Sequence, residues 1–445
     1  MKLSEASHII HGTLHGEDAH FFGASSDTRL LAPGELFFAW KGDNFDAHQF
    51  LESAAAKGAI AAVVERFIPS AELAQIVVDD SQKALAVLAK AWKKEWQGTT
   101  IALTGSNGKT TLKEMIRSIL SLRHSVLATE GNFNNHVGCP LTLLKLSEKH
   151  DIAVIEMGAN HAGEIAYLTD LVGPDIAIIN NAGPCHLEGF GSIEGVANAK
   201  AEIYQGLTDN GVAVINGDDA YAPLWKEKAA GHKQITFGTY ENAQADLTYE
   251  IIEGMTFVLR YQDKSVEVSL NLLGAHNIRN SAAAAAAALM AGATFEDIKQ
   301  GLEALMPVKG RLEPIAYRDH ITLINDAYNA NPNSLKAGIN ALKSPDRWVV
   351  LGDMRELGSD EIKLHKECGV YAKDAGVTRL FTLGDLSKHM TLAFGEGAAH
   401  YNSHDSLFNA LQAALNDYSG EALEVLFKGS NSMNMPLVIN ALLKR

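Results

Sequence analysis

The sequence predicts an α/β protein with three domains, and three observations support this class. The chain has 445 residues, 47% of them hydrophobic, which is enough for about three packed cores. Short apolar runs alternate with segments of helical periodicity, as in parallel sheets covered by helices. One apolar run, residues 101–104, leads into a glycine-rich turn and a helix that begins at Lys109. This arrangement predicts a nucleotide site near the middle of the chain.

Residues 1–80 are expected to form a small α/β domain. Its clearest helix is predicted over residues 50–58, and an apolar strand follows over 59–64. A second helix, predicted over 81–97 from its apolar spacing, leads into the nucleotide loop. A domain boundary near residue 80 follows from this change of pattern.

A polar turn in the first domain is a candidate substrate site. Ser26, Asp27, Thr28 and Arg29 lie close together, and Lys41 follows a second tight turn. Hydroxyl, guanidinium and ammonium groups could hold a diphosphate or a uracil edge. A surface turn closed by an internal Asp27–Arg29 pair explains the same residues equally well.

Residues 81–307 are expected to form the central domain, built on a parallel sheet. Its predicted strands are the apolar runs 101–104, 152–156, 176–180 and 212–216. The alanine tract of residues 282–288 predicts a closely packed helix rather than a linker, because alanine has the highest helix propensity.

Residues 308–445 are expected to form a smaller parallel α/β domain. Its strands are predicted over residues 321–325, 348–351, 379–383 and 425–427. In α/β proteins the loops at the carboxyl ends of the strands bind ligands, so the polar residues that follow these runs are the candidate site.

The glycine-rich turn is predicted to bind phosphate. Backbone N–H groups of such a turn, and of the helix start behind it, converge on an oxyanion. Lys109 can reach the outer phosphates, and the Thr110 hydroxyl can hold a magnesium ion. Gly105 stands only three residues before Gly108, closer than in the general phosphate loop, so an ordinary strand-turn-helix corner is the alternative. The candidate residues are Gly105, Ser106, Asn107, Gly108, Lys109, Thr110 and Thr111.

Four further polar clusters lie near apolar runs or the helices that follow them. Glu156 ends one predicted strand, where a carboxylate suits magnesium, although a glutamate that caps a helix is an alternative. His186 follows another strand and could ligate a metal or orient a phosphate. Asn134 and Asn135 lie in a loop of amides and glycine that suits substrate positioning or a structured turn. Lys200 lies in a helical segment, where a lysine is normally solvated.

Charge and cysteine content exclude several classes of protein. The formal charge of −15 disfavours nucleic acids and anionic membranes as partners. The three cysteines include no Cys-x-x-Cys pair, which disfavours a disulfide framework and a thiolate metal site. The first residues lack the apolar core of a signal peptide, and no apolar run reaches membrane-spanning length. We therefore expect a cytoplasmic protein.

The order of these motifs resembles that of the Mur ligase family over the whole chain, and the shortened phosphate loop is the form that this family uses. The segments that carry the resemblance are 104–110, 156–159, 186–191, 276–280 and 310–313. The resemblance implies an ATP-dependent ligase that forms an amide through an acyl phosphate. It also implies a UDP-binding first domain, a central ATPase domain, a Rossmann-like third domain and a monomer.

The resemblance also implies roles for individual residues. Lys109, Lys200, His186 and Arg311 would be catalytic, and Lys200 would be carbamylated. Two magnesium ions would be held by Thr110, Glu156, His186 and Lys200. Asn277 and Asn280 would lie at the adenine, Arg311 at a phosphate and Asp326 at the ribose. Because Arg311 belongs to the third predicted domain, we expect that domain to close onto the ATP loop.

One segment indicates which reaction of the family the protein catalyses. Residues 326–334, with Tyr328, Asn329 and Asn331, are similar to the motif of the family members that add D-alanyl-D-alanine to UDP-N-acetylmuramoyl-tripeptide. An amino-acid-adding member of the family and an ATP-hydrolysing enzyme without ligation are the alternatives. Asn431 departs from the resemblance, since the family usually has arginine at that position.

Overall fold

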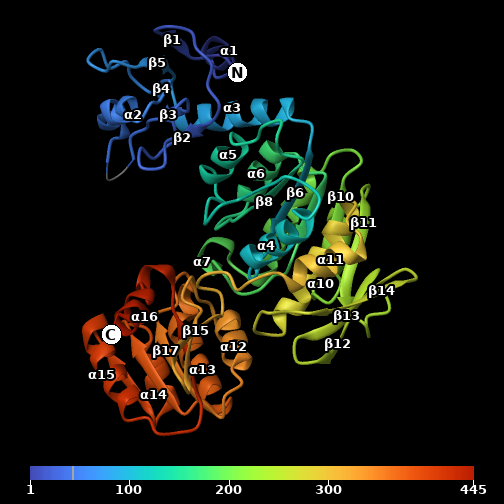
Figure 1. Ribbon diagram of the computed structural model, residues 1–445, viewed down its shortest axis with the longest axis vertical. Helices are drawn as coiled ribbons and strands as arrows, with labels where there is room; N and C mark the ends of the chain where they lie inside the picture. The colour runs from blue at the N-terminus through green and yellow to red at the C-terminus, as the bar shows by residue number, and fades with distance from the viewer. Residues whose placement is uncertain (43–44, 445) are drawn as a thin grey trace.

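The computed structural model describes residues 1–42 and 45–444, which form three sheets that follow one another along the longest axis of the molecule (Figure 1). The sheets have five, nine and six strands in chain order. Helices lie against each sheet, so the α/β class predicted from the sequence is confirmed.

The first sheet has the order β1-β5-β4-β3-β2, and only β1 runs antiparallel to its neighbour. Its strands are β1 (Thr13–His15), β2 (Ala24–Ser25), β3 (Leu36–Phe38), β4 (Ala61–Val64) and β5 (Ala74–Val77). The helix predicted over 50–58 is α2 (Leu51–Ala56), preceded by the 3-10 turn η1 (Ala47–Phe50). A further helix, α1 (Leu3–Ile9), was not predicted.

Helix α3 (Ser81–Glu95) joins the first sheet to the second. The Asp80 side chain caps its start by accepting hydrogen bonds from the backbone N–H groups of Gln82 and Lys83. On its apolar face, the Trp92 ring lies 5.4 Å from that of Phe21, and its indole N–H donates to the Leu146 carbonyl at 2.8 Å. One continuous apolar core therefore extends from the first sheet into the helices of the second.

The central sheet has the order β14-β13-β12-β11-β10-β9-β6-β8-β7. Strands β6 to β12 are parallel to one another, whereas β13 and β14 form an antiparallel extension of β12 that was not predicted. The bounds are β6 (Thr99–Thr104), β7 (Val126–Ala128), β8 (Ile152–Glu156), β9 (Ile176–Ile179), β10 (Val212–Asn216), β11 (Lys233–Thr239), β12 (Leu247–Glu253), β13 (Thr256–Tyr261) and β14 (Lys264–Ser269). The four predicted strands are β6, β8, β9 and β10.

Helices cover both faces of this sheet. One face carries α4 (Lys109–Leu120), α10 (His276–Met290) and α11 (Phe295–Glu303). The predicted alanine helix lies within α10, and every alanine of residues 282–288 is buried, with α10 packed against α4. The other face carries α5 (Gly138–Leu143), α6 (Glu164–Val172), α8 (Ile193–Ala201), η2 (Glu202–Gly206) and α9 (Ala222–Lys228).

The third sheet has the order β15-β16-β20-β17-β18-β19, and only β15 is antiparallel. Its strands are β15 (Glu313–Arg318), β16 (Ile321–Asn325), β17 (Asp346–Gly352), β18 (Arg379–Leu383), β19 (Ala398–Tyr401) and β20 (Leu423–Lys428). One face packs against α12 (Pro332–Ala341), α13 (Glu361–Asp374) and α14 (Lys388–Phe394), and the other against α15 (His404–Asn416) and α16 (Pro436–Leu443). The four predicted strands are present, and β15 and β19 are additional.

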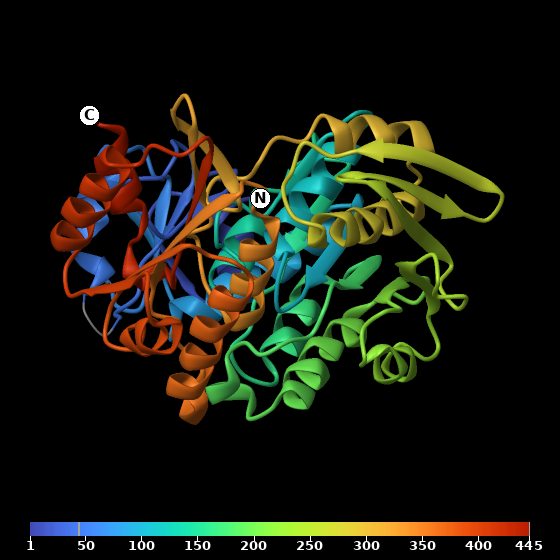
Figure 2. The same cartoon turned by 90° about the horizontal axis from the view of Figure 1, so that it is seen from below.

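Three short helices complete the chain: α7 (Leu187–Phe190), η3 (Gly358–Asp360) and η4 (Asn431–Met433). In the part of the chain that the structure describes, no helix has both the length and the apolar character needed to cross a membrane. Seen from below, the C-terminal region lies beside the central region, and α7 contacts η3 between them (Figure 2). Loops at the carboxyl ends of the central and third sheets thus face one cleft.

Candidate active site

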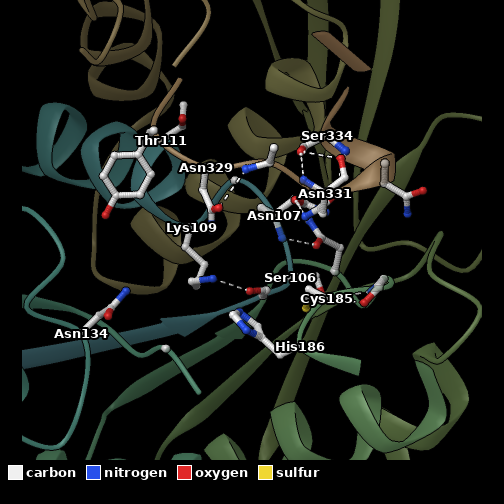
Figure 3. Close-up of a pocket in the computed structure, with 18 of the residues that line it drawn as sticks. Ser106, Asn107, Lys109, Thr111, Asn134, Cys185, His186, Asn329, Asn331 and Ser334 are labelled. Atoms are coloured by element: carbon white, nitrogen blue, oxygen red, sulfur yellow. Dashed lines mark hydrogen bonds between the residues drawn. The ribbon is translucent and has the colours of Figure 1, made fainter. Parts of the chain in front are cut away.

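The cleft between the central and C-terminal regions has a volume of about 800 Å³ and collects most of the predicted site residues. Figure 3 shows side chains from both regions turned into it. The predicted residues that line it are Gly105, Ser106, Asn107, Gly108, Lys109, Thr111, Asn134, Asn135, Glu156, His186, Lys200, Asn277, Asn280, Arg311, Asp326, Tyr328, Asn329 and Asn331. Thr110 lies beside it, where its hydroxyl accepts a 3.2 Å hydrogen bond from Arg311.

The glycine-rich turn connects β6 to α4, as predicted. Gly108 has φ of +78° and immediately precedes the helix, whose first N–H groups receive no side-chain cap. A Cβ at this glycine would lie 2.8 Å and 2.9 Å from amide atoms of Asn280 and Asn180, so both the conformation and the space require glycine. The Lys109 ammonium donates to the Gly105 carbonyl at 2.8 Å (Figure 3). The result is an anion site at a helix N-terminus.

Asparagines at the end of β9 hold this turn in place. Asn181 accepts from the Asn107 backbone N–H at 2.9 Å, and both Asn180 and Asn181 donate to the Asn107 carbonyl at 3.0 Å. Asn180 also donates to Asn280 at 2.9 Å, and Asn280 donates to Asn277 at 3.0 Å. The predicted adenine residues therefore belong to the network behind the turn. The role of Asn180 and Asn181 was missed, although their place at the end of the predicted strand 176–180 was a signal for it.

Glu156 is the last residue of β8 and is only 2% exposed. One carboxylate oxygen accepts a 2.8 Å hydrogen bond from Asn134, while the other is buried without a hydrogen-bond partner in the described part of the chain. The alternative of a helix cap is wrong, because α6 begins only at Glu164. A buried carboxylate oxygen with no donor is suited to a cation.

The two predicted substrate asparagines differ in their surroundings. Asn134 points its amide at Glu156, whereas Asn135 uses its side-chain oxygen within its own loop. That oxygen accepts from the backbone N–H groups of Val137 and Gly138 at 3.2 Å and 2.8 Å. The alternative of a structured turn therefore describes Asn135 well.

His186 precedes α7 with a left-handed backbone, at φ of +50°. Its Nδ1 contacts the carboxylate of Glu356, which follows β17 and also has a positive φ, of +63°. Burial is the main cause that lowers the pKa of His186, and the Glu356 charge opposes this effect. Glu356 was missed by the sequence analysis because its strand end is remote from His186 in the sequence. Two strained residues thus meet across the cleft.

Lys200 is 2% exposed, so the expectation of a solvated lysine is wrong. It lies in α8 and lines the cleft together with Cys185 and Lys109. Burial lowers the pKa of Lys200 to about 8, the charge of Cys185 raises it and that of Lys109 lowers it further. Burial therefore favours the neutral amine of Lys200 more than it would be favoured in a solvated lysine.

The C-terminal region contributes a second set of side chains. The Arg311 guanidinium lies 3.9 Å from the centre of the Tyr328 ring and reaches Thr110 at the start of α4. Asp326 pairs with the buried Lys428 at 2.6 Å, and its other oxygen accepts from the Leu312 N–H at 3.2 Å. Both carboxylate oxygens of the predicted ribose residue, Asp326, therefore already have hydrogen-bond partners within the protein. Lys428 was missed, although it directly follows the predicted strand 425–427; in the structure it ends β20 as Glu156 ends β8.

Asn331 has two functions in this geometry. Its side-chain oxygen caps α12 by accepting from the Ser334 N–H at 2.9 Å, and its amide donates to Asn107 at 2.7 Å (Figure 3). Asn329 uses its carbonyl oxygen to accept from Lys428 at 2.9 Å. The motif that follows β16 therefore contacts the phosphate loop directly.

The polar turn of the first domain is not brought to this cleft. Arg29 pairs with Asp27 at 2.6 Å while its own side chain is 87% exposed, which is the internal pair that the sequence analysis gave as the alternative. Lys41 bridges to Asp46 through the backbone. Ser26 and Thr28 are half-buried in the same turn. In the described residues, the structure contains no cluster of three or more His, Cys, Asp or Glu side chains that could hold a metal by itself.

Comparisons with known proteins agree with the geometry. Residues 103–288 match the Mur ligase middle domain, and residues 310–431 match the Mur ligase glutamate ligase domain. The chain is 42% identical to a UDP-N-acetylmuramoyl-tripeptide–D-alanyl-D-alanine ligase of Haemophilus influenzae, with 99% of this chain and 98% of the relative covered. The identity to the Escherichia coli protein of the same name is 41%, with the same coverage.

Solved structures give the same result. A MurF structure from Acinetobacter baumannii superposes with a TM-score of 0.90 at 33% identity, covering 99% of this chain and 98% of the other. MurF from Thermotoga maritima in complex with ADP superposes with a TM-score of 0.82 at 27% identity, covering 95% and 97%. From the two domain matches and the full-length relatives we conclude that this chain belongs to the Mur ligase family of ATP-dependent ligases.

Proposed function

We propose that the protein joins the amino group of D-alanyl-D-alanine to the terminal carboxylate of UDP-N-acetylmuramoyl-tripeptide, with cleavage of ATP to ADP and phosphate. The observation that carries the proposal is the 2.7 Å hydrogen bond between Asn331 and Asn107. It brings the segment that resembles the dipeptide-adding members onto the loop suited to ATP. The names of the Haemophilus and Escherichia relatives agree with this reaction.

ATP is assigned to the turn between β6 and α4. Its N–H groups and the α4 dipole suit the phosphates, while Lys109 and Arg311 are the nearby cations. A carboxylate that attacks the γ-phosphorus meets strong charge repulsion, which such cations reduce. Asn277, Asn280 and Asp326 remain our proposal for the adenine and ribose side.

Magnesium fits the donor set around Glu156. The buried, unpartnered oxygen of Glu156 is the clearest sign, and Thr110 and His186 supply further oxygen and nitrogen donors. No three-carboxylate cluster exists among the described residues, so phosphate oxygens would have to complete the coordination. Two bound magnesium ions would supply charge neutralisation of the transferring phosphoryl group.

Lys200 is our proposed carbamate. The ammonium would first lose one proton, and its neutral amine would then attack carbon dioxide, forming an N–C bond and releasing a second proton, so that a buried cation becomes a carboxylate. The lowered pKa of Lys200, about 8, and its burial beside Lys109 support this change, because a carboxylate is better matched to that neighbour. The new carboxylate would be an oxygen ligand for the second magnesium.

The reaction proceeds in two displacements. The tripeptide carboxylate attacks the γ-phosphorus and ADP leaves, and the dipeptide amine then attacks the acyl phosphate carbonyl and phosphate leaves. Lys109 and Arg311 stabilise the charge that develops on the phosphoryl oxygens. Water has to be excluded while the acyl phosphate exists, so we propose that the C-terminal region closes tightly onto the central one.

The UDP end is assigned to the first domain. Arg29 and Lys41 are both exposed, so each is accessible to an anionic ligand. Ser26, Asp27 and Thr28 would complete that contact. We further propose that the protein acts as a cytoplasmic monomer, since its substrates are ATP and a soluble nucleotide precursor.

The proposal is tested by incubating the protein with ATP, magnesium and both peptide substrates, omitting each in turn. We expect phosphate release and amide formation only in the complete mixture. Phosphate release that ignores both peptides would favour simple ATP hydrolysis and refute ligation. Product formed with single amino acids but not with the dipeptide would favour an amino-acid-adding relative. Scattering that shows no compaction in the complete mixture with an ATP analogue would refute closure.

A further inference from the structure

Arg355 lies in the loop that follows β17, at the carboxyl edge of the third sheet. Its backbone N–H donates a 2.8 Å hydrogen bond to the Ser430 hydroxyl, in the loop that follows β20. Its side chain is 53% exposed and lines the cleft together with Asn431 and Ser432. The backbone of Arg355 is thus fixed while its guanidinium faces the space between the two regions.

Most lysine and arginine side chains that line the cleft are buried or already interact with another residue. Among the residues that the structure describes, the lysines and arginines that line it are Lys109, Lys200, Arg279, Arg311, Arg355 and Lys428. Lys109 belongs to the phosphate loop, Arg311 donates to Thr110 across the cleft, and Lys200 is buried. Lys428 is buried against Asp326, and Arg279 interacts with Tyr249. The exposed guanidinium of Arg355 is therefore the one suited to a new anionic ligand.

One carboxylate lies near this guanidinium, and a second belongs to the next residue in the chain. Asp353 is fully buried and is 3.4 Å from Arg355, while one of its oxygens accepts from the N–H groups of Leu386 and Ser387. An arginine has five N–H donors, so this contact steadies the guanidinium and leaves donors free. The second carboxylate, Glu356, is turned toward His186. Neither carboxylate uses all the N–H donors of the Arg355 guanidinium.

The position of Arg355 also fits the size of the second substrate. Glu356, the next residue, contacts His186, so this loop lies against the strand end with the proposed magnesium ligands. A dipeptide spans at most about 7 Å, so its carboxylate has to be anchored close to the reacting carbonyl. A planar guanidinium binds a carboxylate in bidentate fashion.

We propose that Arg355 binds the terminal carboxylate of D-alanyl-D-alanine and thereby selects acceptors that carry a free carboxylate. The inference rests on the proposed function, since it names the contact of that reaction's second substrate. Arg355 is a specificity-determining residue that turns the acceptor amine toward the acyl phosphate. The cation belongs to the C-terminal region, so acceptor binding depends on that region being docked.

The test compares D-alanyl-D-alanine with its C-terminal amide as acceptor. For the unmodified protein we expect a KM for the amide about 20-fold above that for the acid. In Arg355→Gln the KM for the acid should rise to that of the amide, while the KM values for ATP and the nucleotide precursor stay unchanged. Arg379→Gln, an exposed arginine that lies over Trp348 in the same region, is the matched control and should keep the full preference.

A second variant removes the arginine at position 355 and introduces one at position 431. Asn431 lines the same part of the cleft, so Asn431→Arg in the Arg355→Gln background should restore at least part of the preference for the acid. Equal use of acid and amide by the unmodified protein would overturn the inference even if no variant folded. A preserved preference in Arg355→Gln would also overturn it. Absence of any ligation by the unmodified protein would instead refute the proposed function.

Discussion

The side-chain amide of Asn331 donates a 2.7 Å hydrogen bond to the side-chain oxygen of Asn107, and this bond joins residues that are 224 positions apart. Asn107 lies in the phosphate loop, and Asn331 caps the helix that follows β16. The nucleotide loop is therefore in direct contact with the C-terminal region, and several properties of the protein should depend on this contact.

The first prediction concerns that bond. Asn331→Ser keeps an oxygen for the helix cap but removes the donor to Asn107, so we expect the KM for ATP to rise about 10-fold, with unfolding free energy changed by about 1 kcal/mol or less. Steady-state kinetics and chemical denaturation measure the two effects. Asn340→Ser is the control, because Asn340 belongs to the same helix and bonds only within its own region, to Tyr371. An unchanged KM in the first variant would show that the contact is dispensable.

The second prediction separates backbone strain from crowding. Gly108→Ala places a Cβ against the amides of Asn280 and Asn180 at a positive φ, whereas Gly231→Ala meets the same kind of φ, +96°, with no atom within 4 Å. We expect Gly231→Ala to cost about 1 kcal/mol and Gly108→Ala clearly more, with loss of ATP binding only in the latter. Thermal denaturation and nucleotide titration provide the measurements. Equal behaviour of the two variants would contradict the crowding at Gly108.

The third prediction addresses Lys200. Lys200→Ala should lose ligation by more than about 100-fold, and a short carboxylic acid in the buffer should restore part of it by replacing the missing carboxylate. Lys109→Ala should be equally impaired, but its loss should not respond to the acid, because that residue is needed as a cation. Full activity of Lys200→Ala, or rescue of both variants alike, would refute the carbamate.

The fourth prediction concerns pH and stability. Burial lowers the pKa of His276 to about 4, the charge of Asp326 raises it, and the charges of Lys428 and Arg279 lower it further. Between pH 4 and about 6.5 the unfolded chain therefore binds a proton that the folded protein does not, so unfolding is favoured as the pH falls. The total effect is up to roughly 3 kcal/mol below pH 4 and nothing above about pH 7.

His276→Gln should lack this component. We expect its unfolding free energy, measured by denaturant titration at a series of pH values, to fall less steeply than that of the unmodified protein below pH 6.5. His124→Gln changes an exposed histidine and should follow the unmodified protein. Parallel curves for all three proteins would contradict the burial effect at His276.

The sequence predicted the strands that are apolar and buried on both faces, such as β8, β9 and β17, since a continuous apolar run is a direct signal of such a strand. It missed β15, whose side chains alternate between half-buried and exposed, and β19, which is half-buried throughout. Edge strands have one open side and therefore do not require an apolar run. Helix α1 was missed because only Leu3 and Ala6 of its seven residues are buried.

Individual residues of the candidate site could be predicted from the sequence, but their burial and their contacts with one another could not. Glu156 ends a predicted strand and His186 lies in the loop after another. Ligands of α/β proteins bind at this edge of the sheet, so both residues could be predicted as site residues. The burial of Lys200 depends on the packing of α8 against its neighbours, and the contact of Glu356 with His186 on the docking of two regions. Neither relation has a local sequence signal. Lys200 was identified as a site residue through the family resemblance, whereas Arg355 was identified only through the structure.

The junctions on the two sides of the central sheet differ in kind. Helix α3 binds the first sheet through buried rings such as Phe21 and Trp92, so parting them would expose apolar surface to water. The contacts across the cleft include hydrogen bonds and ion pairs, such as Asn331 with Asn107 and Glu356 with His186, while Leu273 adds a small apolar contact with the C-terminal core. Water or a phosphate can replace such bonds at little net cost. We therefore expect substrate arrival to reposition the C-terminal region more easily than it separates the first two sheets.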